Sequence, residues 1–151
     1  MDKIILMDKR QFLVSLLLLF LVYPLVVVHE VGHAFVCAVY GLDYSISLSW
    51  FGRSSAMCMG DEFNEMLFGF AGGFLVVVVL LILLAVPFTR NNTGIKISLI
   101  SLLAMALLNS LVEGVFFGFY NQNIVYVQYG LLMVLLISFL GQWSRIIFQQ
   151  K

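Results

Sequence analysis

Residues 12–34 read FLVSLLLLFLVYPLVVVHEVGHA, an apolar run that ends in three ionisable side chains. A helix needs about 20 apolar residues to cross a bilayer, so this run is long enough to span one. His29 and His33 are spaced i, i+4, which places both imidazoles on one helix face, where they can converge on a metal ion. Glu30 lies beside His29, where a carboxylate can take a proton from a water molecule near that metal.

The alternative interpretation of this motif is a chance match, with both histidines packed as hydrogen-bonded core groups. Ionisable side chains in hydrocarbon are costly, however, and their default interpretation is functional. The chain contains two histidines, and both fall within the motif. We therefore predict that His29 and His33 bind a metal and that Glu30 is catalytic.

Composition indicates the class of protein. The chain is 62% hydrophobic and 11% charged, with a mean hydropathy of +1.06. In soluble domains about half of the residues are apolar and about a quarter are charged. We therefore expect a multi-pass integral membrane protein of the cell membrane, surrounded by the lipid bilayer. The formal net charge is zero, so nothing indicates a nucleic-acid partner.

The hydropathy pattern predicts an all-α membrane protein, a bundle of about four transmembrane helices in a single domain over residues 1–151. The helices are expected at residues 11–40, 63–88, 95–119 and 124–148. At 1.5 Å per residue the first helix is about 45 Å long and exceeds the hydrocarbon core, so it must tilt, kink or protrude. Pro24 is the expected kink, and Gly41 is the expected end of this helix.

Residues 43–59 predict a short β-hairpin between the first two helices. Polar and apolar residues alternate from Asp43 to Trp50, which is the period of a strand, and Phe51 to Ser55 reads as a turn. The free edge of such a hairpin could receive an extended peptide by strand addition. Alternatively, the hairpin only covers the helix bundle.

A catalytic zinc ion usually has three protein ligands and leaves one position for water. Glu113 is the candidate for the third ligand, because it is the one acidic residue of the helix predicted at 95–119. In an antiparallel bundle it lies at the same end as the two histidines. Asn109 shares its helix face at i, i+4. The alternative is a protonated or hydrogen-bonded carboxyl group without a metal.

Cys37 and Cys58 match no metal-ligand spacing of their own. Cys37 follows His33 by one helical turn and could face the same site. We favour its interpretation as a small apolar residue in a helix interface, and we expect a disulfide between the two cysteines only if the geometry happens to allow it.

The motif His29-Glu30-Val31-Gly32-His33-Ala34 in a transmembrane helix resembles the site-2 protease family of intramembrane zinc metalloproteases. The strand-like segment 43–59, then Ala71-Gly72-Gly73, then Asn109 with Glu113-Gly114, follow in the order of that family's motifs. The resemblance covers about residues 20–120. The acidic residue is Glu where the family usually has Asp, and the family's prolines near Asn109 and after Gly73 are absent.

The resemblance implies that the protein is an enzyme, a zinc metalloendopeptidase that hydrolyses peptide bonds in or near the transmembrane segments of other membrane proteins. Zn²⁺ would be held by His29, His33 and Glu113. Glu30 would act as general base, and the Asn109 amide would help to stabilise the oxyanion. The sequence does not indicate an oligomeric state.

The competing interpretation is a non-proteolytic zinc-binding membrane protein, such as a transporter, a sensor or a pseudoprotease that binds transmembrane clients. The intact Glu30 argues against a decayed enzyme, because a site that only holds metal does not need it. A transporter needs polar positions along a path through the bilayer, and the second and fourth predicted helices offer few.

Two arguments about membrane orientation conflict. The cationic residues on the side of the two termini outnumber those on the hairpin side, where Arg53 is alone; they are Lys3, Lys9, Arg10, Arg90, Lys96, Arg145 and Lys151. The positive-inside rule then predicts cytoplasmic termini and a site nearer the outer face. Resemblance to the best-known bacterial site-2 proteases implies a site near the cytoplasm instead.

Overall fold

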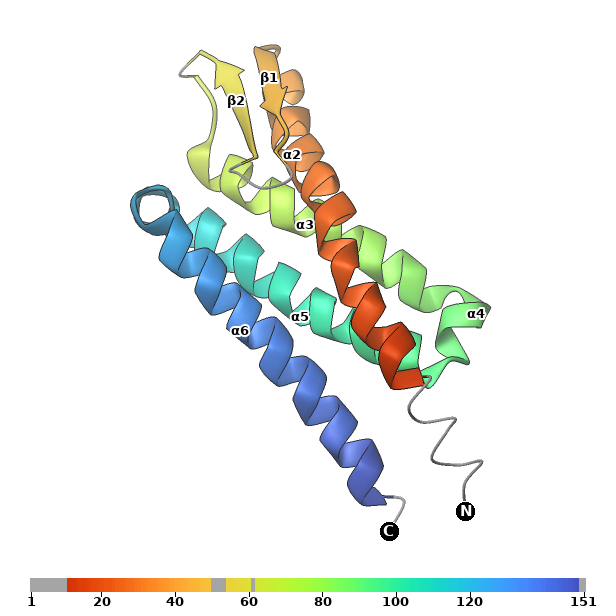
Figure 1. Ribbon diagram of the computed structural model, residues 1–151. Helices are drawn as coiled ribbons and strands as arrows, with labels where there is room; N and C mark the ends of the chain where they lie inside the picture. Colours follow the sequence, from red (N-terminus) through yellow and green to blue (C-terminus); the bar gives the residue numbers. More distant parts are fainter. Residues whose placement is uncertain (1–10, 50–53, 61, 150–151) are drawn as a thin grey trace.

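The computed structural model describes residues 11–49, 54–60 and 62–149 of the chain (Figure 1). It is 81% helical, and four of its helices are long and apolar enough to cross a membrane. The spans are Gln11–Val39, Glu65–Ala85, Thr93–Val115 and Gln122–Arg145. The predicted class, an all-α membrane protein with a short hairpin after the first helix, is confirmed.

The first span changes geometry just before its proline. Residues 11–18 are helical, Leu19–Leu21 form the 3₁₀ turn η1, and helix α2 covers Val22–Val39. Pro24 has no N–H group, and its ring crowds the carbonyl group four residues earlier, which lies in this turn. The kink expected at Pro24 is therefore observed as a 3₁₀ turn, which lies about one turn before the proline.

Helix α2 ends at the predicted glycine. Gly41 has a φ of 70°, a left-handed conformation that glycine adopts without steric cost. The N–H groups of Gly41 and Leu42 donate hydrogen bonds to the carbonyls of Ala38 and Cys37, both at 3.0 Å. This is the Schellman arrangement, which satisfies the last carbonyls of a helix and turns the chain back.

The hairpin lies along the C-terminal part of α2 (Figure 1). Strand β1 is Asp43–Ser47 and strand β2 is Ser55–Met59, and they pair antiparallel with Ile46 opposite Ala56. The hairpin predicted at 43–59 is confirmed for these strands. Residues 51–53 of the turn expected from Phe51 to Ser55 lie outside the described residues, and Ser55 is the first residue of β2.

Helix α3, Glu65–Ala85, is three residues shorter at its C-terminal end than predicted. Its N-terminus is capped by Asn64, whose side chain accepts a hydrogen bond from the N–H of Leu67 at 2.9 Å. It ends where Val86 becomes extended, because the residue before a proline avoids the helical conformation. Helix α4, Pro87–Arg90, then forms a single turn where a loop was expected from residue 89.

The predicted loop at residues 120–123 is helical except at Asn123. Helix α5 is Thr93–Val115, and helix α6 is Phe117–Gln149. The connection is reduced to Phe116, which leaves the helical conformation at φ −117° and ψ 40°. A second break, at Asn123, has φ −119° and ψ 21°, and it divides α6 into a short first part and the long helix that follows. The prediction therefore placed α5 too late at both ends, whereas the long part of α6 begins after Asn123, as predicted.

The bundle places α3 between α2 and α5, with α6 against α5 (Figure 1). Fully buried apolar residues such as Leu80, Leu102 and Phe139 join α3, α5 and α6 in one core. At the end opposite the hairpin, Ser98 Oγ donates to the carbonyl of Ser15 at 2.6 Å, and Trp143 Nε1 donates to Ser15 Oγ at 3.1 Å. Such interhelical hydrogen bonds stabilise helices in lipid, where a lone polar group is costly.

Glycines at 69 and 73 let α3 approach α5, as the small-xxx-small spacing predicted. A Cβ atom at Gly69 would lie 2.5 Å from the backbone oxygen of Glu113, and one at Gly73 would lie 2.6 Å from Cβ of Ser110. Both distances are below van der Waals contact, so a side chain at either position must displace α5.

We expect Gly69→Ala to destabilise the protein by about 1–3 kcal/mol, the usual cost of overpacking a close contact. The control is Gly141→Ala, because a Cβ there has no atom within 4 Å. The measurement is the thermal unfolding midpoint in detergent, which should fall for Gly69→Ala and stay within error or rise for Gly141→Ala. Equal midpoints would show that the close approach of α3 and α5 is not needed.

Candidate metal centre

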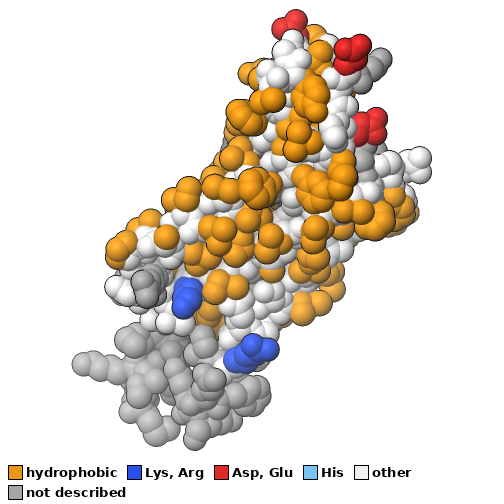
Figure 2. Space-filling model, turned by 180° about the vertical axis from the view of Figure 1, so that it is seen from behind, with side chains coloured by type: hydrophobic (Ala, Val, Ile, Leu, Met, Phe, Trp, Pro, Cys, Tyr) orange, Lys and Arg blue, Asp and Glu red, His pale blue; other side chains and the backbone are white. Residues whose placement is uncertain are grey.

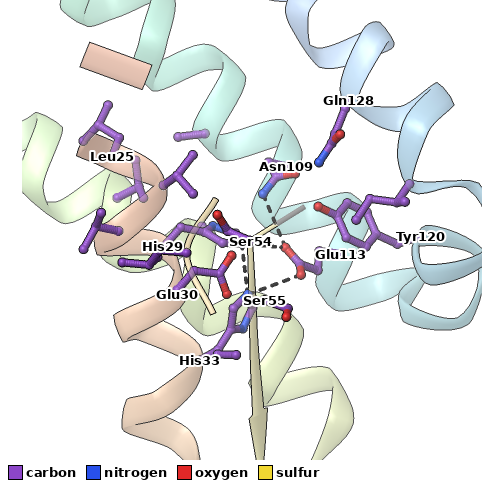
Figure 3. Close-up of a pocket in the computed structure, with 18 of the residues that line it drawn as sticks. Leu25, His29, Glu30, His33, Ser54, Ser55, Asn109, Glu113, Tyr120 and Gln128 are labelled. Atoms are coloured by element: carbon purple, nitrogen blue, oxygen red, sulfur yellow. Dashed lines mark hydrogen bonds and ion pairs between the residues drawn. The ribbon is translucent and has the colours of Figure 1, made fainter. Parts of the chain in front are cut away.

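His29, His33 and Glu113 come together in the interior of the bundle (Figure 3). His29 Nε2 lies 3.1 Å from Glu113 Oε2, and His33 Nε2 lies 3.3 Å from Glu113 Oε1. The two Nε2 atoms are 2.9 Å apart. The structure thus joins the three predicted metal ligands from α2 and α5 in one group that could hold a metal ion.

The separations of these donor atoms suit a small divalent cation. Ligands at about 2.0–2.1 Å from a tetrahedral zinc ion lie about 3.3 Å from one another. The three observed separations run from 2.9 to 3.3 Å, slightly tighter than that. Two neutral imidazoles and a carboxylate are also the donor types that zinc takes in catalytic sites.

The orientation of His33 is set by the backbone of α3. Its Nδ1 atom lies 2.7 Å from the carbonyl oxygen of Phe68, and its ring stacks on the Phe68 ring at 4.5 Å between centroids. A carbonyl oxygen can only accept, so Nδ1 must donate, and in the neutral ring Nε2 then has the lone pair that can bind a metal ion. A histidine ligand fixed in this way is typical of metal sites.

Asn109 lies in the same cavity, one helical turn before Glu113 on α5. Its Nδ2 atom donates to Glu113 Oε2 at 3.4 Å. The predicted proximity of the two residues is therefore confirmed, and Asn109 helps to orient the carboxylate. The second N–H of the same amide group can serve another acceptor.

Glu30 is buried beside the two histidines and lines the same cavity (Figure 3). The backbone of Ala56, a residue of β2, lies close to this carboxylate in the cavity lining. Glu30 thus lies next to the candidate metal ligands without being one of them, so its carboxylate can act on a water molecule or a substrate.

The cavity has a volume of about 820 Å³ and is walled by helices α2, α3, α5 and α6 and by strand β2. Besides the predicted residues it exposes Tyr120, Gln128 and Ser55, which the sequence analysis did not assign to the site. Gln128 could have been assigned to the site from the sequence, because a polar residue inside an apolar span is unusual. Tyr120 could not, since aromatic residues near the ends of membrane spans are common.

Gly72 makes room for the metal ligands. A Cβ atom at this position would lie 2.5 Å from His33 Nε2 and 2.7 Å from His29 Cε1. The middle glycine of Ala71-Gly72-Gly73 therefore forms the wall of the site against which both imidazoles lie.

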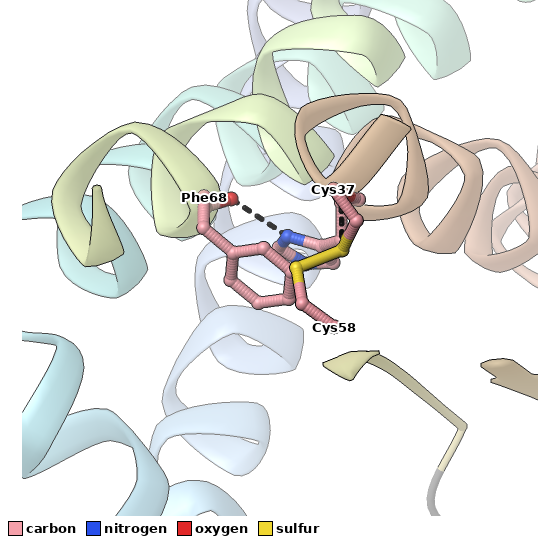
Figure 4. Close-up of a disulfide and its surroundings, with 4 residues drawn as sticks. Cys37, Cys58 and Phe68 are labelled. Carbon is pink, nitrogen blue, oxygen red and sulfur yellow. Dashed lines mark hydrogen bonds between the residues drawn. A yellow bond between two sulfur atoms is a disulfide. The ribbon is translucent and has the colours of Figure 1, made fainter. Parts of the chain in front are cut away.

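Cys37 and Cys58 form a disulfide that joins α2 to β2 (Figure 4). The preferred sequence interpretation, an apolar filler at Cys37, was wrong. The hairpin folds back along α2 and brings Cys58 beside the cysteine one turn after His33, a juxtaposition that spacing along the chain cannot indicate. Closing a loop of 21 residues stabilises a fold by about 3 kcal/mol.

Comparison of the chain with protein-family models, with curated proteins and with solved structures finds no match.

We expect the purified parent protein to bind about one zinc ion per chain after zinc supplementation, and His33→Ala to bind at least about 100-fold more weakly, since it lacks one of three ligands. Gly72→Ala should also weaken binding, because its methyl group must displace an imidazole. The control is Gly130→Ala, where a Cβ meets nothing within 4 Å. Metal analysis and competition with a chelator measure this, and unchanged affinity in His33→Ala would exclude the site.

Proposed function

We propose that this protein is an intramembrane zinc metalloprotease that hydrolyses peptide bonds in or near the transmembrane segments of other membrane proteins. The observation that carries the proposal is the buried Glu30 carboxylate, which shares one membrane-embedded cavity with His29, His33 and Glu113. The residues that resemble site-2 proteases are the ones that meet there. We therefore propose membership of that family.

Zinc is the proposed metal because two imidazoles and one carboxylate leave one of its four usual positions open. When bound, zinc acidifies a water molecule and polarises the carbonyl group of a substrate. The remaining steps fall to the side chains of the protein.

Glu30 is the proposed general base and acid. Its carboxylate would take a proton from the attacking water and return it to the leaving amine. The backbone of Ala56 lies beside this carboxylate in the wall of the cavity. Asn109, whose amide already donates to Glu113, would turn its second N–H toward the oxyanion.

The lining of the cavity suits a segment of a membrane protein. Apolar side chains of α2 and α6 form the walls that lead away from the candidate metal ligands, among them Val22, Leu25, Ile124 and Leu131. Strand β2 forms another wall through residues 55–58. An apolar chain could therefore lie against α2 and α6, while extended backbone beside β2 brings a peptide bond toward Glu30.

A zinc-binding protein without protease activity is the second candidate, and Glu30 distinguishes the two. Storage or sensing needs the three metal ligands alone. A fourth ionisable side chain, buried beside them, is costly in a membrane unless it takes part in chemistry.

We expect Glu30→Gln to lower peptide cleavage by at least about 100-fold, the usual contribution of a general base, while zinc binding is retained. Membranes from cells that express the parent, Glu30→Gln or His33→Ala are compared by mass spectrometry for new peptide termini inside transmembrane segments. A cleaved protein found in this way then becomes the substrate for purified enzyme.

The parent alone should produce such termini. Full activity in Glu30→Gln would contradict the proposed mechanism. If the zinc-loaded parent produces no new termini, the protease proposal fails, whereas the metal site stands.

A further inference from the structure

The Cys37–Cys58 disulfide lies beside the metal centre. Cys37 Sγ lies 3.6 Å from the carbonyl oxygen of His33, and Cys58 lines the same cavity as Glu30. Phe68, whose carbonyl orients His33, packs against both cysteines in a small core (Figure 4). The disulfide therefore joins three features of the site: the helix with the ligands, the strand along the cavity and the backbone that fixes His33.

Strand β2 depends on this link for its position. An isolated two-stranded hairpin is marginally stable at best in water, and this hairpin packs against the described part of the bundle mainly through α2. Ala56, which lines the same cavity as Glu30, precedes Cys58 by two residues on the same strand. The disulfide thus holds β2 in the wall of the cavity beside Glu30.

Charged residues distinguish the two ends of the bundle. Figure 2 shows acidic side chains at the hairpin end and Lys and Arg side chains at the opposite end. Asp43 in β1 and Glu65 at the start of α3 belong to the first group, and Lys96 in α5 and Arg145 in α6 belong to the second. By the positive-inside rule the end with Lys96 and Arg145 is cytoplasmic.

The disulfide gives an independent argument for the same orientation. Disulfides persist in oxidising compartments and are rare in the cytoplasm. This one lies at the acidic hairpin end of the molecule. Charge and cysteine chemistry therefore place the hairpin on the same, non-cytoplasmic side of the membrane.

We propose that the metal centre opens to the oxidising, non-cytoplasmic side of the membrane, and that Cys37 and Cys58 are positioning residues whose disulfide keeps β2 against the Glu30 carboxylate. The effect on Glu30 rests on the proposed protease function; the orientation and the position of β2 do not. Under the protease proposal, substrates are cut near the non-cytoplasmic ends of their transmembrane segments.

The orientation is tested with single-cysteine variants of the full chain in a Cys37→Ser/Cys58→Ser background. Ser47→Cys lies on exposed β1, and Thr93→Cys lies at the exposed start of α5. In intact cells a membrane-impermeant maleimide should label Ser47→Cys, whereas Thr93→Cys should react only after lysis. The reverse pattern, or equal labelling of both in intact cells, would overturn the orientation.

The positioning role is tested by amide hydrogen exchange of zinc-loaded protein in detergent. In Cys37→Ser/Cys58→Ser, and in the parent after reduction, exchange across residues 55–59 should become about tenfold faster or more. The reason is that β2 is then no longer covalently attached to α2 and opens locally more often. Exchange in α3 and α5 and the zinc content should not change. The control is Met59→Ser, an exposed position of the same strand, which should exchange as the parent does.

Unchanged exchange in β2 would overturn the positioning role. With a substrate in hand, the disulfide-free variant should show a lower kcat at unchanged zinc content, and added reductant should have no further effect on it. If no form of the protein cleaves any substrate, the protease proposal fails, while the labelling and exchange results still decide the orientation and the role of the disulfide.

Discussion

Three ionisable side chains inside apolar helices can be accommodated at low cost only if they meet one another, because hydrocarbon offers them no hydrogen-bonding partner. His29, His33 and Glu113 meet this requirement with contacts of 2.9 to 3.3 Å between α2 and α5. The rest of the bundle is arranged so that this meeting is possible. A metal ion at the same point would satisfy all three at once.

The glycines of α3 are the second part of this arrangement. Helix α3 lies between α2 and α5, and it can do so without separating the metal ligands because its contact positions lack side chains. Gly72 faces the imidazoles, and Gly69 faces the backbone at Glu113. The same helix supplies the Phe68 carbonyl that orients His33. The close packing of α3 therefore determines the geometry of the site.

The hairpin gives the site a wall that the helices do not supply. Without β2, Glu30 would face a cavity bounded by helices alone. A disulfide is a means of holding a small, edge-exposed hairpin that buries little apolar area of its own. The proposed orientation and the proposed role of β2 therefore both depend on Cys37 and Cys58.

The sequence by itself determined the membrane class, the four spans, the hairpin and the three residues that could hold a metal ion, because hydropathy, strand period and the cost of intramembrane charge are local properties that need no partner. It also identified Asn109 and Glu30 as neighbours of the site. Only the tertiary structure decided the disulfide, the Phe68 carbonyl, the position of Ala56 beside Glu30 and the roles of Gly72, Tyr120 and Gln128. Each of these depends on which segments of the chain come into contact once the helices pack together. A contact between distant segments produces no periodic pattern in the sequence, so the sequence alone cannot predict it. The ends of α3 and α5 were also misplaced, because capping by Asn64 and Asn92 and the breaks at Val86 and Phe116 are decided by local backbone geometry, which the hydropathy pattern does not record.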